Sequence, residues 1–118
     1  LPLGTPGGDV QTQAMLQSLL NVVVFDMSPQ QAVEQPRVAT WSAPNSFEPH
    51  TAQPGRITLE SRLPVSTGDQ LGQWGHDVDW WPQASWRAGS VCMIKADRET
   101  GVIRGASDLR RQALVLGW

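Results

Sequence analysis

The sequence predicts an α+β fold, and two patterns lead to this prediction. Helix-type segments come first, at residues 10–25 and 29–35. Strand-type segments dominate the last third, where residues 90–96 read SVCMIKA and residues 102–105 return after a short turn. An apolar run, a turn and a return strand are typical of an antiparallel hairpin. The chain has 118 residues and a mass of 12.9 kDa, so we expect one domain over residues 1–118.

Composition excludes several classes of protein. Hydrophobic residues make up 40% of the chain and charged residues 17%, which is unlike a disordered acidic tail. The apolar runs are far shorter than the roughly 18 residues of a membrane span, so we expect no membrane partner. The formal net charge of −2 argues against a nucleic-acid partner. The single cysteine excludes an internal disulfide and a multi-thiolate metal site, and we expect no cofactor and no metal.

The first helix has a recognisable start and a clear polar stripe. Residues 2–8 contain two prolines and three glycines, so we expect no regular structure there, and Asp9 is a suitable N-cap. The polar side chains of the helix form one stripe, and its large apolar side chains form the opposite half, which we expect to be mostly covered. The stripe contains Gln13, Gln17, Ser18 and Asn21, and the apolar half contains Met15, Leu16, Leu19, Leu20, Val22 and Val23.

The second helix begins at a strong start signal. Ser28 is a good N-cap, Pro29 suits the first helical position, and Gln31 completes a capping box. Pro36 disfavours a helical conformation at the residue before it, so this helix should end near Gln35.

The middle of the chain is predicted as short strands separated by a long loop and one weak helix. Gly75 is a suitable C-terminal stop for that helix. We expect strands at 38–41, 56–62 (half-buried) and 77–81, a loop at 42–55 and a helix at 64–74.

The side chains that could carry chemistry have plainer explanations. Cys92 lies inside the apolar run at 90–96, so we expect a buried, unreactive thiol in a strand covered on both faces. His76 would lie on the opposite face of its strand from Asp77 and Asp79, which is a poor arrangement for a metal site. His50 lies in the proline-rich loop.

The tryptophans allow two interpretations. Trp74, Trp80, Trp81 and Trp86 could form a stacking platform for sugars or unpaired bases. Packing in a core or an interface is the more common use of such rings, and we favour it.

The sharpest local feature is the sequence Thr5-Pro6-Gly7-Gly8-Asp9, which leads directly into a helix. Two glycines allow the backbone to approach a ligand closely. N–H groups at a helix start favour negative charge, as a hole for a developing oxyanion requires. On the residues alone, a simple turn before a helix remains an alternative.

Several blocks, in order along the chain, resemble the small subunit of the γ-glutamyltransferase family. The blocks include TPGG at 5–8, QAMLQ at 13–17, MSPQQAVE at 27–34 with Pro36-Arg37, and SFEPH at 46–50. They continue with GHDV at 75–78, AGSVC at 88–92, GASD at 105–108 and the closing LGW at 116–118. Within this family, the blocks look most similar to those of bacterial γ-glutamyltransferase-like acylases.

The resemblance implies an N-terminal-nucleophile hydrolase with an αββα sandwich, of which this chain would form the C-terminal part of the small subunit. In this family a threonine exposed by self-cleavage attacks the γ-glutamyl amide and uses its own amine as base. Gly7 and Gly8 would supply the oxyanion hole through their backbone N–H groups.

The chain also departs from the family pattern. No threonine-led start is present, Leu109 stands where proline is usual, and Asp26 stands where glycine is common. We therefore expect this chain alone to be inactive. The expected partners are the remaining small-subunit segment and the large subunit of the same precursor, or a second copy, together with a small γ-glutamyl substrate. The alternatives are a non-catalytic interaction module that keeps the scaffold and, more remotely, a carbohydrate-binding module that uses the tryptophans.

Overall fold

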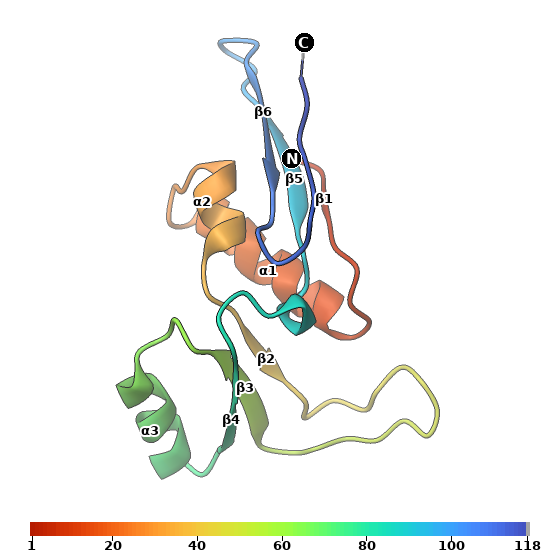
Figure 1. The fold of residues 1–118 in the computed structure, drawn as a ribbon, viewed down its shortest axis with the longest axis vertical. Helices are drawn as coiled ribbons and strands as arrows, with labels where there is room; N and C mark the ends of the chain where they lie inside the picture. The colour runs from red at the N-terminus through yellow and green to blue at the C-terminus, as the bar shows by residue number, and fades with distance from the viewer. Residues whose placement is uncertain (118) are drawn as a thin grey trace.

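A computed structural model describes residues 1–117, so Trp118 of the closing LGW sequence lies outside the described residues. The chain forms two three-stranded sheets and passes between them twice, at residues 35–37 and at residues 82–91 (Figure 1). Helices and strands are mixed, as the α+β prediction requires. Within the described part of the chain, no helix is long and apolar enough to cross a membrane.

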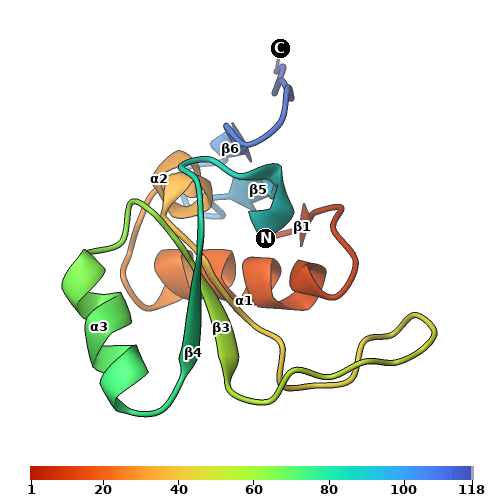
Figure 2. The ribbon, with the colours of Figure 1, turned by 60° about the horizontal axis from the view of Figure 1, so that its bottom comes forward.

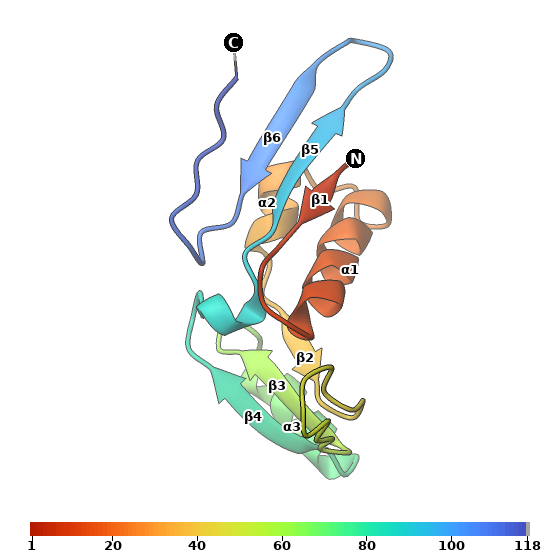
Figure 3. The same cartoon turned by 90° about the vertical axis from the view of Figure 1, so that its right-hand side faces the viewer.

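The first sheet carries the two early helices on one face. Its strands β1 (Leu3–Gly4), β5 (Cys92–Ala96) and β6 (Ile103–Ser107) pair antiparallel, with β5 in the centre. Helices α1 (Val10–Val23) and α2 (Pro29–Glu34) pack against this sheet (Figure 3). The predicted hairpin of the last third is therefore confirmed, with β6 shifted by one to two residues.

The second sheet has the order β2-β3-β4. Strand β2 (Val38–Thr40) runs antiparallel to β3 (Arg56–Glu60), whereas β3 and β4 (Asp77–Trp81) are parallel. We expected antiparallel strands, but helix α3 (Val65–Gln73) provides the crossover that a parallel pair needs (Figure 2). A 3-10 turn, η1 (Trp86–Ala88), lies between β4 and β5 in the chain.

The start of the chain is more regular than its composition predicts. Residues 2–8 were expected to lack regular structure, but Leu3 pairs with Met93 and Gly4 with Cys92. Pro2 accepts a hydrogen bond from the Ile94 N–H through its carbonyl, a role that needs no N–H of its own. Tertiary pairing therefore overrides the local turn signals here.

The prediction of which face of α1 is covered was correct for Val22 but wrong for most of the large apolar side chains. Leu16, Leu20 and Val23 are exposed, whereas the buried residues are Val10, Ala14, Ser18 and Val22. Gln13 and Gln17 of the polar stripe face the second sheet, because their side-chain amides hydrogen-bond to the free edge of β2. Asn21 of the same stripe donates to the Ala32 carbonyl of α2. Small buried residues beside this stripe let the helix approach closely.

Other predicted boundaries agree with the structure. Ser28 caps α2 with a complete capping box, and the helix ends before Gln35. Gly75 follows α3 with a φ of 94°, as a C-terminal stop requires. Strand β3 differs from the prediction, since Thr58 and Glu60 are as buried as Leu59 rather than facing solvent.

Cys92 is exposed, so its predicted burial was wrong. Val91, just before β5, and Met93 face the helices and are buried, while Cys92 and Ile94 point to the opposite face. The described residues leave much of that second face exposed. The sequence of β5 predicts burial on both faces, but the structure buries only one.

Candidate functional site

The turn before α1 presents two backbone donors. Gly7 has a φ of 136° and Gly8 a φ of 58°, and both residues are exposed. The carbonyls of these glycines accept hydrogen bonds from Val10 and Gln11, which start the helix. Among residues 1–117, no hydrogen bond is donated by the N–H of Gly7 or of Gly8. Two unpaired donors therefore lie at the positive end of the α1 dipole.

A hollow of about 880 Å³ opens beside this turn. The loop at 42–55 extends away from the second sheet on the side where α1 begins (Figure 2). Its walls come from the turn, the first part of α1, the second sheet, this loop and η1. The lining includes the charged residues Asp9, Arg56, Asp79 and Arg87 and the aromatic residues Phe47 and Trp86.

The segment that leads into β5 packs against the Gly7–Gly8 turn and fixes its position. The Thr5 hydroxyl accepts a 2.6 Å hydrogen bond from the Ser90 N–H and donates to the Pro6 carbonyl at 2.8 Å. Gly89 lies so close that a Cβ there would be 3.0 Å from the Thr5 hydroxyl and 3.1 Å from Ala14. With a φ of 82°, Gly89 also needs the conformational freedom of glycine.

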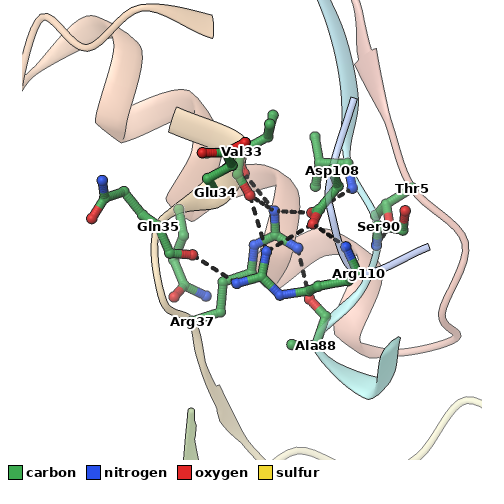
Figure 4. A network of polar contacts seen from close by, with 12 residues as sticks. Thr5, Val33, Glu34, Gln35, Arg37, Ala88, Ser90, Asp108 and Arg110 are labelled. Atoms are coloured by element: carbon green, nitrogen blue, oxygen red, sulfur yellow. Dashed lines mark hydrogen bonds and ion pairs between the residues drawn. The ribbon is translucent and has the colours of Figure 1, made fainter. Parts of the chain in front are cut away.

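A buried network of charges lies next to this supporting segment (Figure 4). Arg37 pairs with Asp108 at 2.6 Å, and Arg110 pairs with Asp108 at 2.9 Å. Arg110 also forms two hydrogen bonds to Glu60, one of them 2.8 Å long from its Nε. Each of these four side chains is at least 98% buried. Two positive and two negative charges therefore neutralise one another away from water. The less buried Arg62 adds a third cation, 3.6 Å from Glu60.

The network fixes the backbone behind the turn. Arg37 donates to the Ala88 carbonyl at 3.0 Å, and Asp108 accepts from the Val91 N–H at 3.0 Å. Burial, reinforced by the nearby charge of Arg110, lowers the pKa of Arg37. Burial also acts to lower the pKa of Arg110, but the hydrogen bonds and charges of Glu60 and Asp108 outweigh it and raise that pKa. These charges therefore hold the 88–91 segment in place.

The other candidates do not gather into a site. Trp81 is buried against Trp41, with ring centroids 6.3 Å apart, while Trp80 packs on Gly68 of α3. Trp74 and Trp86 are exposed, and the four rings form no shared platform.

The histidines have separate local contacts. His50 bonds to the Asn45 carbonyl at 2.8 Å and pairs with Glu48, while His76 contacts the Gly55 carbonyl at 3.3 Å. Over residues 1–117, no group of three metal-binding side chains occurs.

The arrangement can be compared with known proteins. The sequence model of the gamma-glutamyltranspeptidase family matches residues 1–118. The chain belongs to this family. The resemblance carried by the sequence blocks is therefore confirmed, and so is the fold that it implied, part of an αββα sandwich.

Individual relatives agree with the family assignment. The glutathione hydrolase proenzyme of Bacillus subtilis (strain 168) is 28% identical over 117 residues, which are 99% of this chain and 18% of that protein. The cephalosporin acylase from Bacillus halodurans is 26% identical with a TM-score of 0.83, over 99% of this chain and 20% of that one. The gamma-glutamyltranspeptidase from Pseudomonas nitroreducens, complexed with L-DON, supports the fold, at 24% identity and a TM-score of 0.74. That match covers 98% of this chain and 54% of that one.

The chain thus spans about a fifth of the length of the curated relative that it matches. The relatives that it matches include a glutathione hydrolase proenzyme and a cephalosporin acylase.

Proposed function

We propose that this chain supplies the oxyanion hole of an N-terminal-nucleophile hydrolase or acyltransferase that acts on γ-glutamyl amides of the glutathione type. The observation that carries the proposal is the pair of unpaired N–H groups of Gly7 and Gly8 beside the hollow. Donors that are fixed in advance stabilise the negative charge that develops on an attacked carbonyl oxygen. The helix dipole behind them acts in the same direction.

The nucleophile belongs to another part of the complete protein in this proposal. Thr5 is engaged on both sides of its hydroxyl by Ser90 and Pro6. The Thr40 hydroxyl donates to Ser42 at 3.2 Å. An N-terminal nucleophile needs a free hydroxyl next to a free amine. We therefore expect that the 118-residue chain by itself hydrolyses no γ-glutamyl amide.

The partners in this proposal are the remaining segment of the small subunit and the large subunit of the same precursor. They would provide the threonine and the groups that bind the glutamyl end of the substrate. The exposed second face of the first sheet, with Cys92 and Ile94, is the surface that we expect the small-subunit segment to cover.

An ester replacement in the complete protein tests the oxyanion hole. Exchanging Gly8 for glycolic acid deletes its N–H but keeps a backbone that can adopt a φ of 58°. Proline would instead force φ to about −65°. Loss of one oxyanion donor should lower kcat for a γ-glutamyl anilide by about 10²- to 10³-fold, with KM changed much less.

The matched control is the same exchange at Gly101, whose N–H bonds to the Asp97 carbonyl in the hairpin turn, far from the hollow in sequence and fold. That variant should keep its kcat. If the Gly8 ester is as active as the Gly101 ester, the Gly8 N–H is not an oxyanion donor. If the unaltered complete protein hydrolyses no γ-glutamyl amide, the interaction-module alternative replaces the proposed function.

A further inference from the structure

We propose that the loop at 42–55 selects the amine side of the substrate. Asp9 fastens this loop to the Gly7–Gly8 turn through Ser46, and Phe47 presents its ring to an apolar, ring-sized group on the amine that leaves. The inference rests on the proposed function, since it assumes that an amide carbonyl is held at this turn.

The Asp9 side chain bonds to the loop and does not cap its own helix. It occupies the N-cap position of α1, yet its side chain makes no capping hydrogen bond. Its carboxylate instead accepts two hydrogen bonds from Ser46, 37 residues away, from the hydroxyl and from the N–H at 2.9 Å. These bonds hold the pKa of Asp9 below its usual range, so the carboxylate is ionised at neutral pH. When an N-cap residue bonds to a distant loop instead of its helix, a requirement other than helix stability determines its contacts.

The loop is braced before any ligand binds. Asn45 donates to the Thr51 carbonyl at 2.9 Å and, through its side chain, accepts from the Phe47 N–H at 2.8 Å. The His50 N–H closes the turn onto the Phe47 carbonyl at 2.8 Å. Phe47 therefore stands on a turn whose backbone is already fixed, which reduces the entropy lost when a ligand packs on its ring.

The position of Phe47 ties the ring to the two free donors. Its Cε2 would lie 3.6 Å from a Cβ at Gly8, yet the side chain is 66% exposed. Trp86 lines the same hollow and is 58% exposed. Arg111 lies over the Trp86 ring, 5.5 Å from its centroid, so Phe47, beside the turn, is the more open of the two rings. Two aromatic rings in one hollow favour a flat apolar group as the ligand.

The charges of the hollow favour the amine side over the glutamyl side. A glutamyl group carries an α-ammonium and an α-carboxylate, and it needs a free acid and a free cation. Asp79 is paired with Arg56 at 2.8 Å, and Asp9 is engaged by Ser46. Arg87 is the one charged lining residue that makes no ion pair or side-chain hydrogen bond within residues 1–117. No acid is left for the ammonium group, so the glutamyl end belongs elsewhere.

Two substrates that share an acyl group test this inference in the complete protein. L-γ-Glutamyl-4-nitroanilide carries an aromatic amine, and L-γ-glutamyl-methylamide carries a small one. Phe47→Ala should raise KM for the anilide about 3- to 10-fold, the value of one aromatic contact, and leave the methylamide unchanged. Asp9→Ala should shift the preference in the same direction, because the loop is released.

Two further variants separate positioning from damage to the turn. Asp9→Asn keeps an acceptor oxygen for Ser46 and should restore most of the anilide preference. Glu48→Ala is the control, because Glu48 lies in the same loop, is exposed and does not line the hollow. It should leave both KM values unchanged.

The outcomes distinguish the two proposals. If Phe47→Ala and Asp9→Ala leave the ratio of kcat/KM for the two substrates unchanged, or lower both values equally, the loop does not select the amine. In that case an active unaltered protein still supports the proposed function. If the unaltered protein hydrolyses neither substrate, the proposed function fails, and this inference fails with it.

Discussion

At the scale of single residues, Glu60 shows how the fold depends on buried charge. Its carboxylate is fully buried and holds Arg110, while its second oxygen also accepts from the Arg37 N–H at 2.8 Å. Removing one partner of a buried pair leaves the other charge uncompensated, which typically costs about 3–5 kcal/mol. The candidate site depends on this balance, because Arg37 of the same network bonds to the Ala88 carbonyl in the segment that supports the Gly7–Gly8 turn.

Glu60→Gln should therefore destabilise the complete protein by about 3–5 kcal/mol in chemical denaturation, although the shape of the side chain is kept. Asp79→Asn is the matched control, because its partner Arg56 lies at the surface and exposed pairs contribute about 1 kcal/mol or less. Equal denaturation midpoints for the two variants would show that the Glu60 charge stabilises the fold no more than the Asp79 charge does.

The glycines of the site could be predicted from sequence, whereas the charge network could not. Gly7 and Gly8 are adjacent before a helix start, and a positive φ is what such a pair permits. Glu60 ends a strand that alternates polar and apolar residues, a pattern that normally places the polar side chains in water. Its partners come from positions 37 and 110, and nothing local in the sequence indicates that they meet it.

At the scale of elements, α1 is joined to the second sheet by side-chain amides. Gln17 donates to the Val38 carbonyl at 2.9 Å and accepts from the Val38 N–H at 3.0 Å. Gln13 makes the same pair of bonds to Thr40. The glutamines thus imitate a neighbouring strand on the free edge of β2, which explains why the polar stripe of this helix faces protein.

Gln17→Ala should leave the N–H and carbonyl of Val38 unpaired in a partly buried position. Each unsatisfied group costs about 1–3 kcal/mol, so we expect a loss of about 2 kcal/mol or more in the free energy of unfolding. Gln11→Ala on the same helix is the control, because the Gln11 side chain makes no hydrogen bond to the described residues. A loss no larger than that of the control would contradict the role of the amides.

Most helices and strands could be predicted because neighbouring residues determine them. The errors lie where contacts between distant segments determine pairing and burial. The capping box at Ser28 and the hairpin at 97–101 need only neighbouring residues. The covered face of α1, the pairing of β1 with β5 and the parallel register of β3 and β4 depend on segments far away in sequence. Periodicity alone cannot distinguish a solvated glutamine from one that pairs with a strand edge.

At the scale of the whole molecule, the chain exposes more surface than a domain of its mass normally does. Its accessible area is 7615 Å², whereas a folded monomer of this mass exposes about 6300 Å². The radius of gyration is 15.6 Å, against about 13.5 Å for a compact domain of this length. The excess agrees with a chain whose curated relative is about five times longer.

Part of the excess accessible surface lies on the face of the first sheet that is opposite the helices. Cys92 and Ile94 of β5 and Ile103 of β6 share this face, because paired residues of adjacent strands point to the same side. In an αββα sandwich the corresponding face packs against a second sheet. The C-terminal tail covers only a part of it, at Gly105, where a Cβ would lie 2.2 Å from Val115.

The reactivity of Cys92 reports whether a second sheet covers this face in the complete protein. In the complete native protein a second sheet should shield the thiol, so alkylation followed at the Cys92 peptide by mass spectrometry should be slow. Unfolding in urea should speed it about tenfold or more, because a thiol under a packed sheet reacts only through opening of the structure. Labelling at the same rate in the native and the unfolded protein would show that this face stays open to solvent. The sheet would then need another explanation for its apolar side chains.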